Sequence, residues 1–216
     1  MYQRYIPYGP ESFARFLDAY QRFDAGIDHN LVVINHYTEG GSDLHDYRTT
    51  IGDVTADAYC FLNCYSEPLC DGWLSKLAAA LDDGGIVGAT GSYEKAIPHP
   101  HWEQFESAFP NPHIRSNAFM LKRDTALALE WKCPDKESAW MRECGPNGLT
   151  RQVTEKLGLA ALMVGRDAVY SVEDWPTAHV YRCGEQENLL VADNRTCDYQ
   201  HGSPQWRRKL AKLAWG

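Results

Sequence analysis

The chain has 216 residues, a formal net charge of −8 and an aromatic content of 12%. This length suits one globular domain with a complete core, so we expect residues 1–216 to form a single domain. The excess of acidic side chains argues against a nucleic-acid partner. No apolar run approaches the roughly 20 residues that span a bilayer, and the first residues lack a secretory apolar segment.

Seven cysteines are scattered along the chain, and none forms a Cys-x-x-Cys pair. An odd number of cysteines without a paired pattern is typical of reduced thiols. The sequence therefore predicts a cytoplasmic protein.

The first half of the chain alternates between two kinds of apolar pattern. Short apolar runs predict buried strands at 2–7, 31–35, 58–63 and 86–90. Apolar residues at helical spacing predict helices at 11–23 and 72–82, and a short helix within 46–53. This alternation predicts the α/β class, with a Rossmann-like, mainly parallel central sheet flanked by helices.

The second half of the chain is less regular. Four prolines surround a short helical piece within 97–115, and SNAFMLKRD (116–124) predicts a strand that runs into a helix. Residues 136–157 read as helical with a break at 145–148. Another strand is expected at ALMVG, and Ser203 followed by Pro204 predicts the start of a terminal helix.

Ligands of parallel α/β sheets bind beyond the carboxyl ends of the strands. The second predicted strand ends at Asn35, and the third is followed by Asn63-Cys64-Tyr65. We therefore expect Asn35, Asn63 and Tyr65 to line a ligand site. A polar residue at a strand end is also common without any function.

Residues 57–94 resemble the centre of the nucleotide-sugar-binding domain of GT-A glycosyltransferases, specifically the family 2-like enzymes. In that family a strand, an Asp-x-Asp motif, a Trp-Leu helix and a strand ending in Gly follow one another. Trp73-Leu74 and Gly88-Ala89-Thr90-Gly91 fit this pattern, whereas Asn63-Cys64-Tyr65 replaces Asp-x-Asp. The family holds a divalent cation with those carboxylates. A Mn²⁺ or Mg²⁺ cofactor is thus not supported by the motif, and no metal ligand is assigned.

NPHIRSNAFML (111–121) resembles a second pattern of the same family, His or Arg-Thr-Asn-Ala-Phe. The resemblance implies that His113 or Arg115 binds the donor phosphates in place of the metal, since cationic groups offset diphosphate charge. It places Asn117 on the acceptor side. The other interpretation is a turn stabilised by Arg and Asn.

DLHDYRT matches a stretch near the nucleotide in these relatives at Asp43, Tyr47 and Arg48. By resemblance, Asp43 accepts a hydrogen bond from the nucleobase and Arg48 faces phosphate. A loop carboxylate beside a surface arginine is the plainer interpretation.

Inverting GT-A enzymes use an acidic residue near the start of a helix as general base, and Glu143 is the best candidate in order and context. Arg151 is expected to reach the phosphates or to pair with an acidic neighbour. The long segment 173–196 is interpreted as a lid or a fold-back over the site, with Trp175 contacting the acceptor. Structural packing is an equally open role for Trp175.

The leading hypothesis is an inverting glycosyltransferase that moves a sugar from a UDP-, dTDP- or GDP-sugar to a glycan, lipid-linked or other hydroxyl acceptor. Trp206 and Leu213 of the terminal helix, with basic neighbours, suggest a peripheral membrane contact, although such a helix more often packs on its domain. One alternative is a non-catalytic nucleotide-sugar or glycan-binding module. Another is a different α/β enzyme, such as a nucleotidyltransferase.

Overall fold

The structure is a computed structural model, and it describes residues 1–37, 42–95, 108–133 and 135–216. Most of the short helical piece expected within 97–115 lies outside the described residues. The other predicted elements can be compared with the structure directly.

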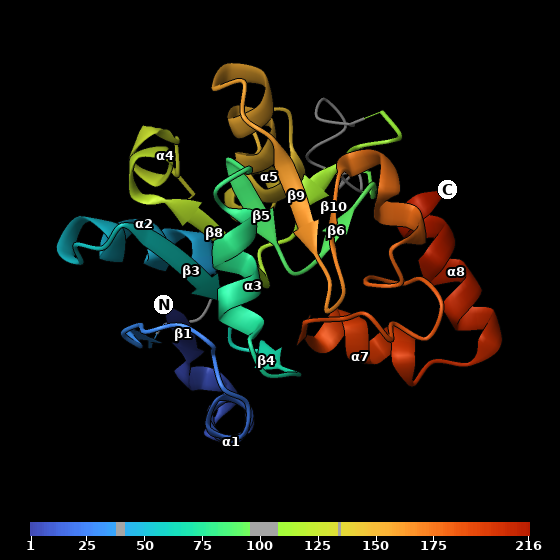
Figure 1. Cartoon of the computed structure of the whole chain (residues 1–216), viewed down its shortest axis with the longest axis horizontal. Coiled ribbons are helices and arrows are strands. Elements are labelled where there is room, and N and C mark those ends of the chain that lie inside the picture. Colours follow the sequence, from blue (N-terminus) through green and yellow to red (C-terminus); the bar gives the residue numbers. More distant parts are fainter. Residues whose placement is uncertain (38–41, 96–107, 134) are drawn as a thin grey trace.

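A seven-stranded sheet forms the centre of the protein (Figure 1). Its strands are β1 (Tyr2–Tyr5), β2 (Val33–His36), β3 (Ala58–Leu62), β5 (Ile86–Gly88), β8 (Ala118–Lys122), β9 (Ala161–Val164) and β10 (Val169–Tyr170). Their order across the sheet is β10-β9-β5-β8-β3-β1-β2. All strands expected from apolar runs are present, which confirms the α/β class.

The sheet is mostly parallel, as expected, with two antiparallel strands that make it mixed. The pairs β1–β2, β1–β3 and β5–β9 are parallel, whereas β3–β8, β5–β8 and β9–β10 are antiparallel. Thus β8 and β10 run against the other five strands. β8 inserts between β3 and β5, and an antiparallel partner does not need the helical crossover that parallel neighbours require.

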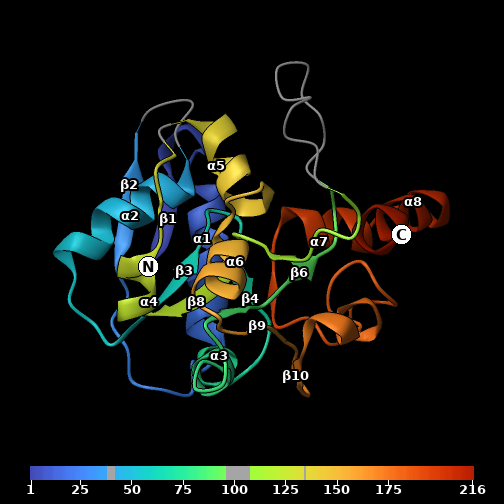
Figure 2. The same cartoon turned by 90° about the horizontal axis from the view of Figure 1, so that it is seen from above.

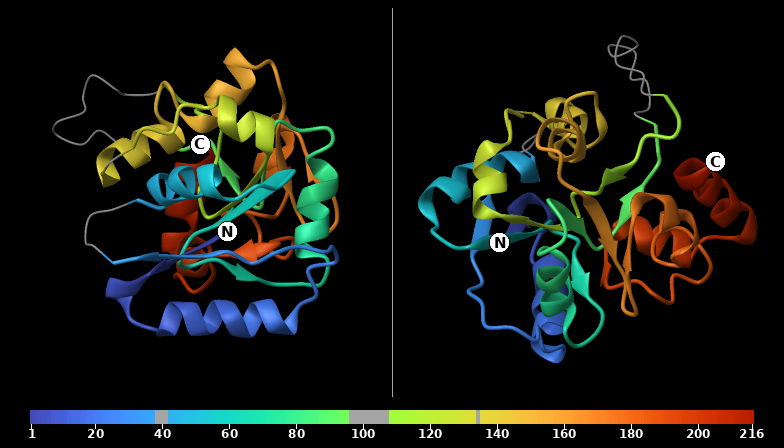
Figure 3. Two further views of the ribbon diagram at one scale, coloured as in Figure 1. Left: turned by 90° about the vertical axis from the view of Figure 1, so that its left-hand side faces the viewer. Right: turned by 45° about the horizontal axis from the view of Figure 1, so that its top comes forward.

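Helices cover both faces of this sheet. α1 (Glu11–Arg22) and α3 (Trp73–Ala80) pack one apolar cluster against it, with Phe16 and Leu77 fully buried. α2 (Asp43–Asp53) and α5 (Lys136–Cys144) contribute to a second cluster. Figure 3 shows α1 and α2 on opposite sides of the first strands.

Short helices connect the later strands. α4 (Arg123–Ala128) follows β8 directly, as the sequence predicts for a strand running into a helix. After α5 the chain breaks at 145–148 and continues as α6 (Leu149–Arg151) and a π-helix (Gln152–Lys156). This break agrees with the interruption expected there.

The C-terminal part forms a lobe beside the sheet (Figure 2). It contains a 3-10 helix (Val172–Thr177), β11 (Val191–Ala192), α7 (Asn194–Gln200) and α8 (Pro204–Trp215). β11 pairs with β4 (Glu67–Pro68), and near this lobe β6 (Gly91–Ser92) pairs with β7 (His113–Ile114). In the described ranges, no helix combines the length and apolar character needed to cross a bilayer.

Trp175 belongs to the core of this lobe. Its side chain is 0% exposed, and its indole N–H donates to the Tyr170 carbonyl oxygen at 3.1 Å. The ring lies against Gly91 of β6. A side chain enclosed in this way cannot contact an acceptor, so the assignment of Trp175 to acceptor binding is wrong.

The contact between Gly91 and Trp175 predicts a stability effect. A Cβ atom at Gly91 lies 2.7 Å from Trp175 Cε3, and the enclosed ring has no room to retreat. We expect Gly91→Ala to lower the free energy of unfolding by about 1–3 kcal/mol, measured by urea denaturation.

The control for this substitution is Gly52→Ala in α2, where a Cβ meets nothing within 4 Å. Alanine is a better helix former than glycine, so this variant should match or exceed the wild-type stability by up to about 1 kcal/mol. Equal midpoints for both variants would show that Trp175 is not tightly enclosed.

Candidate functional site

The candidate site lies at the carboxyl edge of the sheet, where β1, β3 and β5 end. β1 sits between β2 and β3, so the connections that follow β1 and β2 lead to opposite sides of β1. Ligands of α/β sheets bind at such a reversal of strand order. The segment 113–117, which leads into β8, crosses this same edge.

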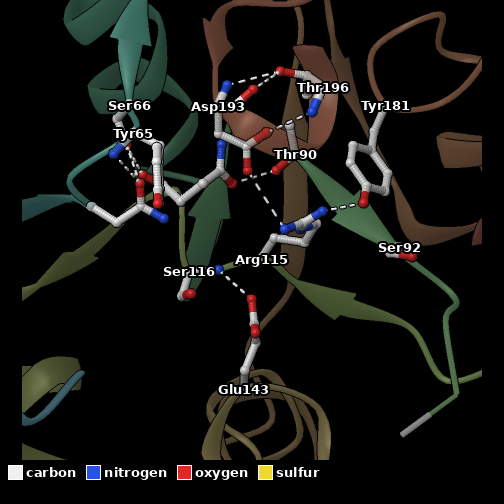
Figure 4. Close-up of polar contacts among 12 residues, drawn as sticks. Tyr65, Ser66, Thr90, Ser92, Arg115, Ser116, Glu143, Tyr181, Asp193 and Thr196 are labelled. Carbon is white, nitrogen blue, oxygen red and sulfur yellow. Dashed lines mark hydrogen bonds and ion pairs between the residues drawn. The ribbon is translucent and has the colours of Figure 1, made fainter. Parts of the chain in front are cut away.

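Glu143 reaches this edge from α5. Its Oε1 accepts a hydrogen bond from the Ser116 backbone N–H at 2.6 Å (Figure 4). Glu143 lies at the carboxyl end of α5 and not near the start of a helix as expected. The dipole of a helix disfavours a carboxylate at this end. The Ser116 N–H therefore compensates for an unfavourable position.

Asp43 lies beside Glu143. It is the first residue of α2, whose N-cap Ser42 accepts from the His45 backbone N–H. Burial, and next the charge of Glu143, raises the pKa of Asp43 to about 7, while a hydrogen bond from the Ser116 side chain opposes this rise. Ser116 thus contacts both carboxyl groups.

Arg115 is engaged by the C-terminal lobe. Its Nη1 donates to the Tyr181 hydroxyl, its Nη2 lies 3.5 Å from Asp193 Oδ2, and its Cζ lies 4.6 Å from the Tyr181 ring centroid (Figure 4). Burial alone would lower the pKa of Arg115, but Tyr181, Asp193 and nearby acids raise it overall. The guanidinium is charged and held in place.

The fold-back segment that supplies these partners is packed rather than free. Tyr181 is 0% exposed, and Arg182 beside it donates to Glu94 Oε1 at 2.7 Å. Gln186 and Asn188 bond within the segment or to its neighbours. The segment 173–196 does fold back to the site edge, and its buried side chains form a wall of that edge.

His113 and Arg151 meet at Asn111. The His113 Nδ1 lies 2.8 Å from the Asn111 carbonyl oxygen, and Arg151 Nη2 donates to Asn111 Oδ1 at 3.2 Å. Burial lowers the pKa of His113 despite the opposing charge of Glu143. The imidazole is therefore neutral at pH 7 and does not supply the positive charge expected of it. Arg151 supplies a positive charge instead, and its Nη1 lies 3.8 Å from Glu155 Oε1.

The Asn63-Cys64-Tyr65 sequence forms a tight turn after β3. Asn63 Oδ1 accepts from the Tyr65 N–H at 3.0 Å, and the Asn63 N–H donates to the Asn117 carbonyl oxygen. Thr90 Oγ1 donates to Asn117 Oδ1 at 2.5 Å. The buried Asn117 Nδ2 has no hydrogen-bond partner among the described residues. Asn63 and Asn117 thus join the ends of β3 and β5 to the start of β8.

An aromatic cluster of Tyr5, Tyr8, His36 and Tyr65 covers the ends of β1, β2 and β3. Ring centroids are 4.4 Å apart for Tyr5 and Tyr8, 5.3 Å for Tyr5 and His36, and 5.7 Å for Tyr8 and Tyr65. Tyr8 is 50% exposed. Burial raises the pKa of Tyr65 to about 12, so its phenol is neutral. Tyr8 and Tyr65 thus offer partly exposed phenol rings at this edge.

Two predicted site residues stay apart from these contacts. Asn35 on β2 and Arg48 on α2 are both exposed. Within residues 1–37, 42–95, 108–133 and 135–216, no hydrogen bond or ion pair joins either of them to Glu143 or Arg115. The edge therefore brings together Asp43, Glu143, His113, Arg115, Arg151, Asn63, Tyr65 and Asn117.

Sequence reasoning missed Ser116, Tyr181 and Asp193. Ser116 stands next to Arg115 in a segment already singled out, so its place in the sequence could have drawn attention to it. Tyr181 is 66 residues from Arg115, and nothing in the local sequence marks the pairing.

In the described part of the chain, no group of three or more His, Cys, Asp or Glu side chains is arranged to hold a metal ion.

No family model fits this chain, and no curated protein matches its sequence. The residues of the carboxyl edge are therefore the basis for inferring a function. These residues combine two neighbouring carboxyl groups, two arginine side chains and partly exposed aromatic rings.

The raised pKa of Asp43 predicts a pH-dependent stability. The folded protein holds this proton up to about pH 7, whereas an unfolded Asp releases it near pH 4. The folded state therefore binds more protons in this window, and stability falls as pH rises through it. Relative to Asp43→Asn, the wild type should lose up to about 1.4 kcal/mol per pH unit between about pH 4 and pH 7.

Urea denaturation across this pH range measures the difference. Asp53→Asn, which removes an exposed carboxylate at the other end of α2, is the control for loss of charge. A constant difference between wild type and Asp43→Asn at all pH values would contradict the raised pKa of Asp43.

Proposed function

We propose that the protein is an inverting glycosyltransferase that uses a nucleoside diphosphate sugar. Glu143 takes the proton of an acceptor hydroxyl, whose oxygen attacks C1 of the sugar. The bond from C1 to the diphosphate oxygen breaks, and the nucleoside diphosphate leaves with the bonding electrons. The acceptor is a glycan, a lipid-linked glycan or another alcohol.

The observation that carries this proposal is the position of Glu143. Its carboxylate stands at the ligand-binding edge of an α/β sheet and is oriented by the Ser116 N–H at 2.6 Å. A general base works best when it is fixed and when its pKa is near the operating pH. Burial and the charge of Glu143 raise the pKa of the neighbouring Asp43 carboxyl to about 7, so the two carboxyls interact. We therefore assign Asp43 to this pair rather than to the nucleobase.

The donor is proposed to lie across the aromatic cluster and towards Arg115. Stacking of a base on an aromatic ring contributes about 1–3 kcal/mol. Tyr8 and Tyr65 offer such rings beside the turn at Asn63. Arg115 and Arg151 supply the fixed positive charge that a leaving diphosphate needs. A divalent cation is the other source of positive charge for the diphosphate, and adding EDTA to the assay tests whether the reaction needs one.

α8 is the element proposed to approach a membrane that carries a lipid-linked acceptor. Leu210 and Ala214 pack inward, whereas Trp206 and Leu213 are 38% and 43% exposed. Lys209 Nζ lies 5.0 Å from the Trp206 ring centroid. An amphipathic face with cationic side chains is the type that contacts anionic lipid surfaces.

Replacing the base should separate transfer from binding. We expect Glu143→Gln to lower kcat at least 100-fold, because the amide cannot take the acceptor proton, while donor affinity changes less than threefold. Release of nucleoside diphosphate from UDP-, dTDP- and GDP-sugars measures kcat, with and without EDTA. Calorimetry measures donor binding.

Glu137→Gln is the matched control, since this exposed glutamate lies in the first turn of the same helix. It should keep the wild-type kcat. A Glu143→Gln variant with near-normal kcat would show that the base lies elsewhere.

Replacing Tyr8 should weaken donor binding through loss of stacking. We expect Tyr8→Ala to raise the donor Kd by about 5- to 100-fold, the equivalent of about 1–3 kcal/mol. Tyr8→Phe keeps the ring and should bind the donor like the wild type. If Tyr8→Ala binds normally, the nucleobase does not lie on the aromatic cluster.

The alternative function is a non-catalytic nucleotide-sugar or glycan-binding module. One observation favours it: the cavity that touches Glu143 and Ser116 has a volume of about 10 Å³, which is room for roughly one water molecule. Arg115 is also already paired with Tyr181 and Asp193. Donor binding by the wild type without release of nucleoside diphosphate would favour this alternative.

A further inference from the structure

One arginine at the carboxyl edge has no counter-charge. Arg4 is the third of the four residues of β1, and its side chain is half-buried. Among the described residues, its guanidinium contacts the ring of Phe13 but forms no ion pair and no hydrogen bond. Glu11, the acidic side chain in the first turn of α1, does not pair with it. Arg4 is thus a positive charge that is partly removed from water and not neutralised.

The other arginines show that this is an exception. Every other buried or half-buried arginine of the described residues lies within 2.7–3.8 Å of a carboxylate oxygen. These are Arg115, Arg142, Arg151, Arg182 and Arg207. Charges that leave water are normally paired, because the loss of hydration of an unpaired charge is unfavourable. The partner of Arg4 is therefore expected to be an anion that does not belong to this chain.

The alternation of side chains along β1 turns Arg4 towards α1. Tyr2 stacks on Phe16 of this helix, with 3.8 Å between the ring centroids. Arg4, two residues on, has its Cζ 4.7 Å from the Phe13 ring centroid. Gln3 lies between them and bonds to α2 on the other face of the sheet. The Phe13 ring therefore holds the guanidinium in place without removing its charge.

The outer nitrogens of Arg4 are the ones that a ligand can reach. Of the guanidinium nitrogens, Nε alone is enclosed without a hydrogen-bond partner. Because the side chain is only half-buried, Nη1 and Nη2 are left open to solvent. Nitrogens of a guanidinium in this fork arrangement bind two oxygens of one phosphate or carboxylate.

Asn35 adds a neutral donor beside Arg4. The two residues are register partners on β2 and β1, and paired residues of neighbouring strands point to the same face of a sheet. Asn35 is exposed, and β2 is the outermost strand, so no further strand covers it. Its side-chain amide carries two N–H donors. The end of β1 and β2 thus combines a fixed cation with an accessible amide.

We propose that Arg4 and Asn35 form a binding site for the oxyanion of a small-molecule ligand, either a phosphate ester or a carboxylate. Arg4 donates from Nη1 and Nη2 to two oxygens of this group, and the Asn35 amide donates to the same group. The proposed transferase reaction assigns the donor diphosphate to Arg115 and Arg151. The oxyanion at Arg4 is therefore a second anionic group and goes beyond the proposed function.

Three ring-containing probes test the proposal. Phenyl phosphate and benzoate carry the two kinds of oxyanion, whereas benzyl alcohol is uncharged. Ligand-observed NMR should show that at least one of the two anions binds the wild type at least tenfold more tightly than benzyl alcohol. The anion that binds more tightly identifies the group as a phosphate ester or a carboxylate.

Substitution of Arg4 provides the second arm. Arg4→Met keeps a long side chain over Phe13 but removes the charge, and it should weaken binding of the preferred anion at least tenfold. Arg123→Met, which removes an exposed arginine of α4, is the control for loss of one positive charge and should bind like the wild type. Asn35→Ala changes an exposed position and should weaken binding at least threefold. It replaces Arg4→Met if that variant fails to fold by circular dichroism.

Two results would overturn the proposal. One is a wild type that binds neither anion more tightly than benzyl alcohol. The other is unchanged binding of the preferred anion in Arg4→Met, or in Asn35→Ala where it takes its place. These assays measure binding without turnover, so failure here is distinct from a near-normal kcat of Glu143→Gln, which would count against the proposed transferase activity.

Discussion

The arrangement of the carboxyl edge depends on one largely buried cation, Arg115, whose side chain is 13% exposed. Arg115 joins the segment before β8 to two residues of the C-terminal lobe, Tyr181 and Asp193. Removing one partner of such a buried pair leaves an uncompensated charge, which typically costs 3–5 kcal/mol. The same segment carries Ser116 and Asn117, so the position of Glu143 and the closure of the strand ends both follow from where Arg115 is held.

The carboxyl pair shows how local geometry and electrostatics combine. Glu143 is at the end of α5 that repels negative charge, and Asp43 is at the end of α2 that attracts it. The helices meet with these two ends together. Burial and the charge of Glu143 outweigh the favourable helix end and raise the pKa of Asp43 to about 7, while Glu143 is held by a single backbone N–H of Ser116. In the proposed reaction Glu143 is the member that this N–H orients as the base.

The sequence predicted the strands and main helices because each has a local apolar period that survives in the fold. It could not predict the place of β8, since pairing with both β3 and β5 is decided by contacts far apart in the chain. The residues assigned to the site by resemblance include Glu143, Arg115 and Asn117, and these lie at one edge of the sheet. It misplaced Trp175, because a tryptophan among polar residues looks alike in sequence whether it binds a ligand or fills a core.

The insertion of β8 also bears on the order in which the chain assembles. β3 and β5 are both made before β8, yet they are not neighbours and each needs β8 on one side. Until residues 118–122 leave the ribosome, the nascent chain presents two unpaired strand edges that face each other across a gap of one strand. Open edges are templates for pairing with other chains. Newly made protein is therefore open to self-association at these strand edges until β8 is made.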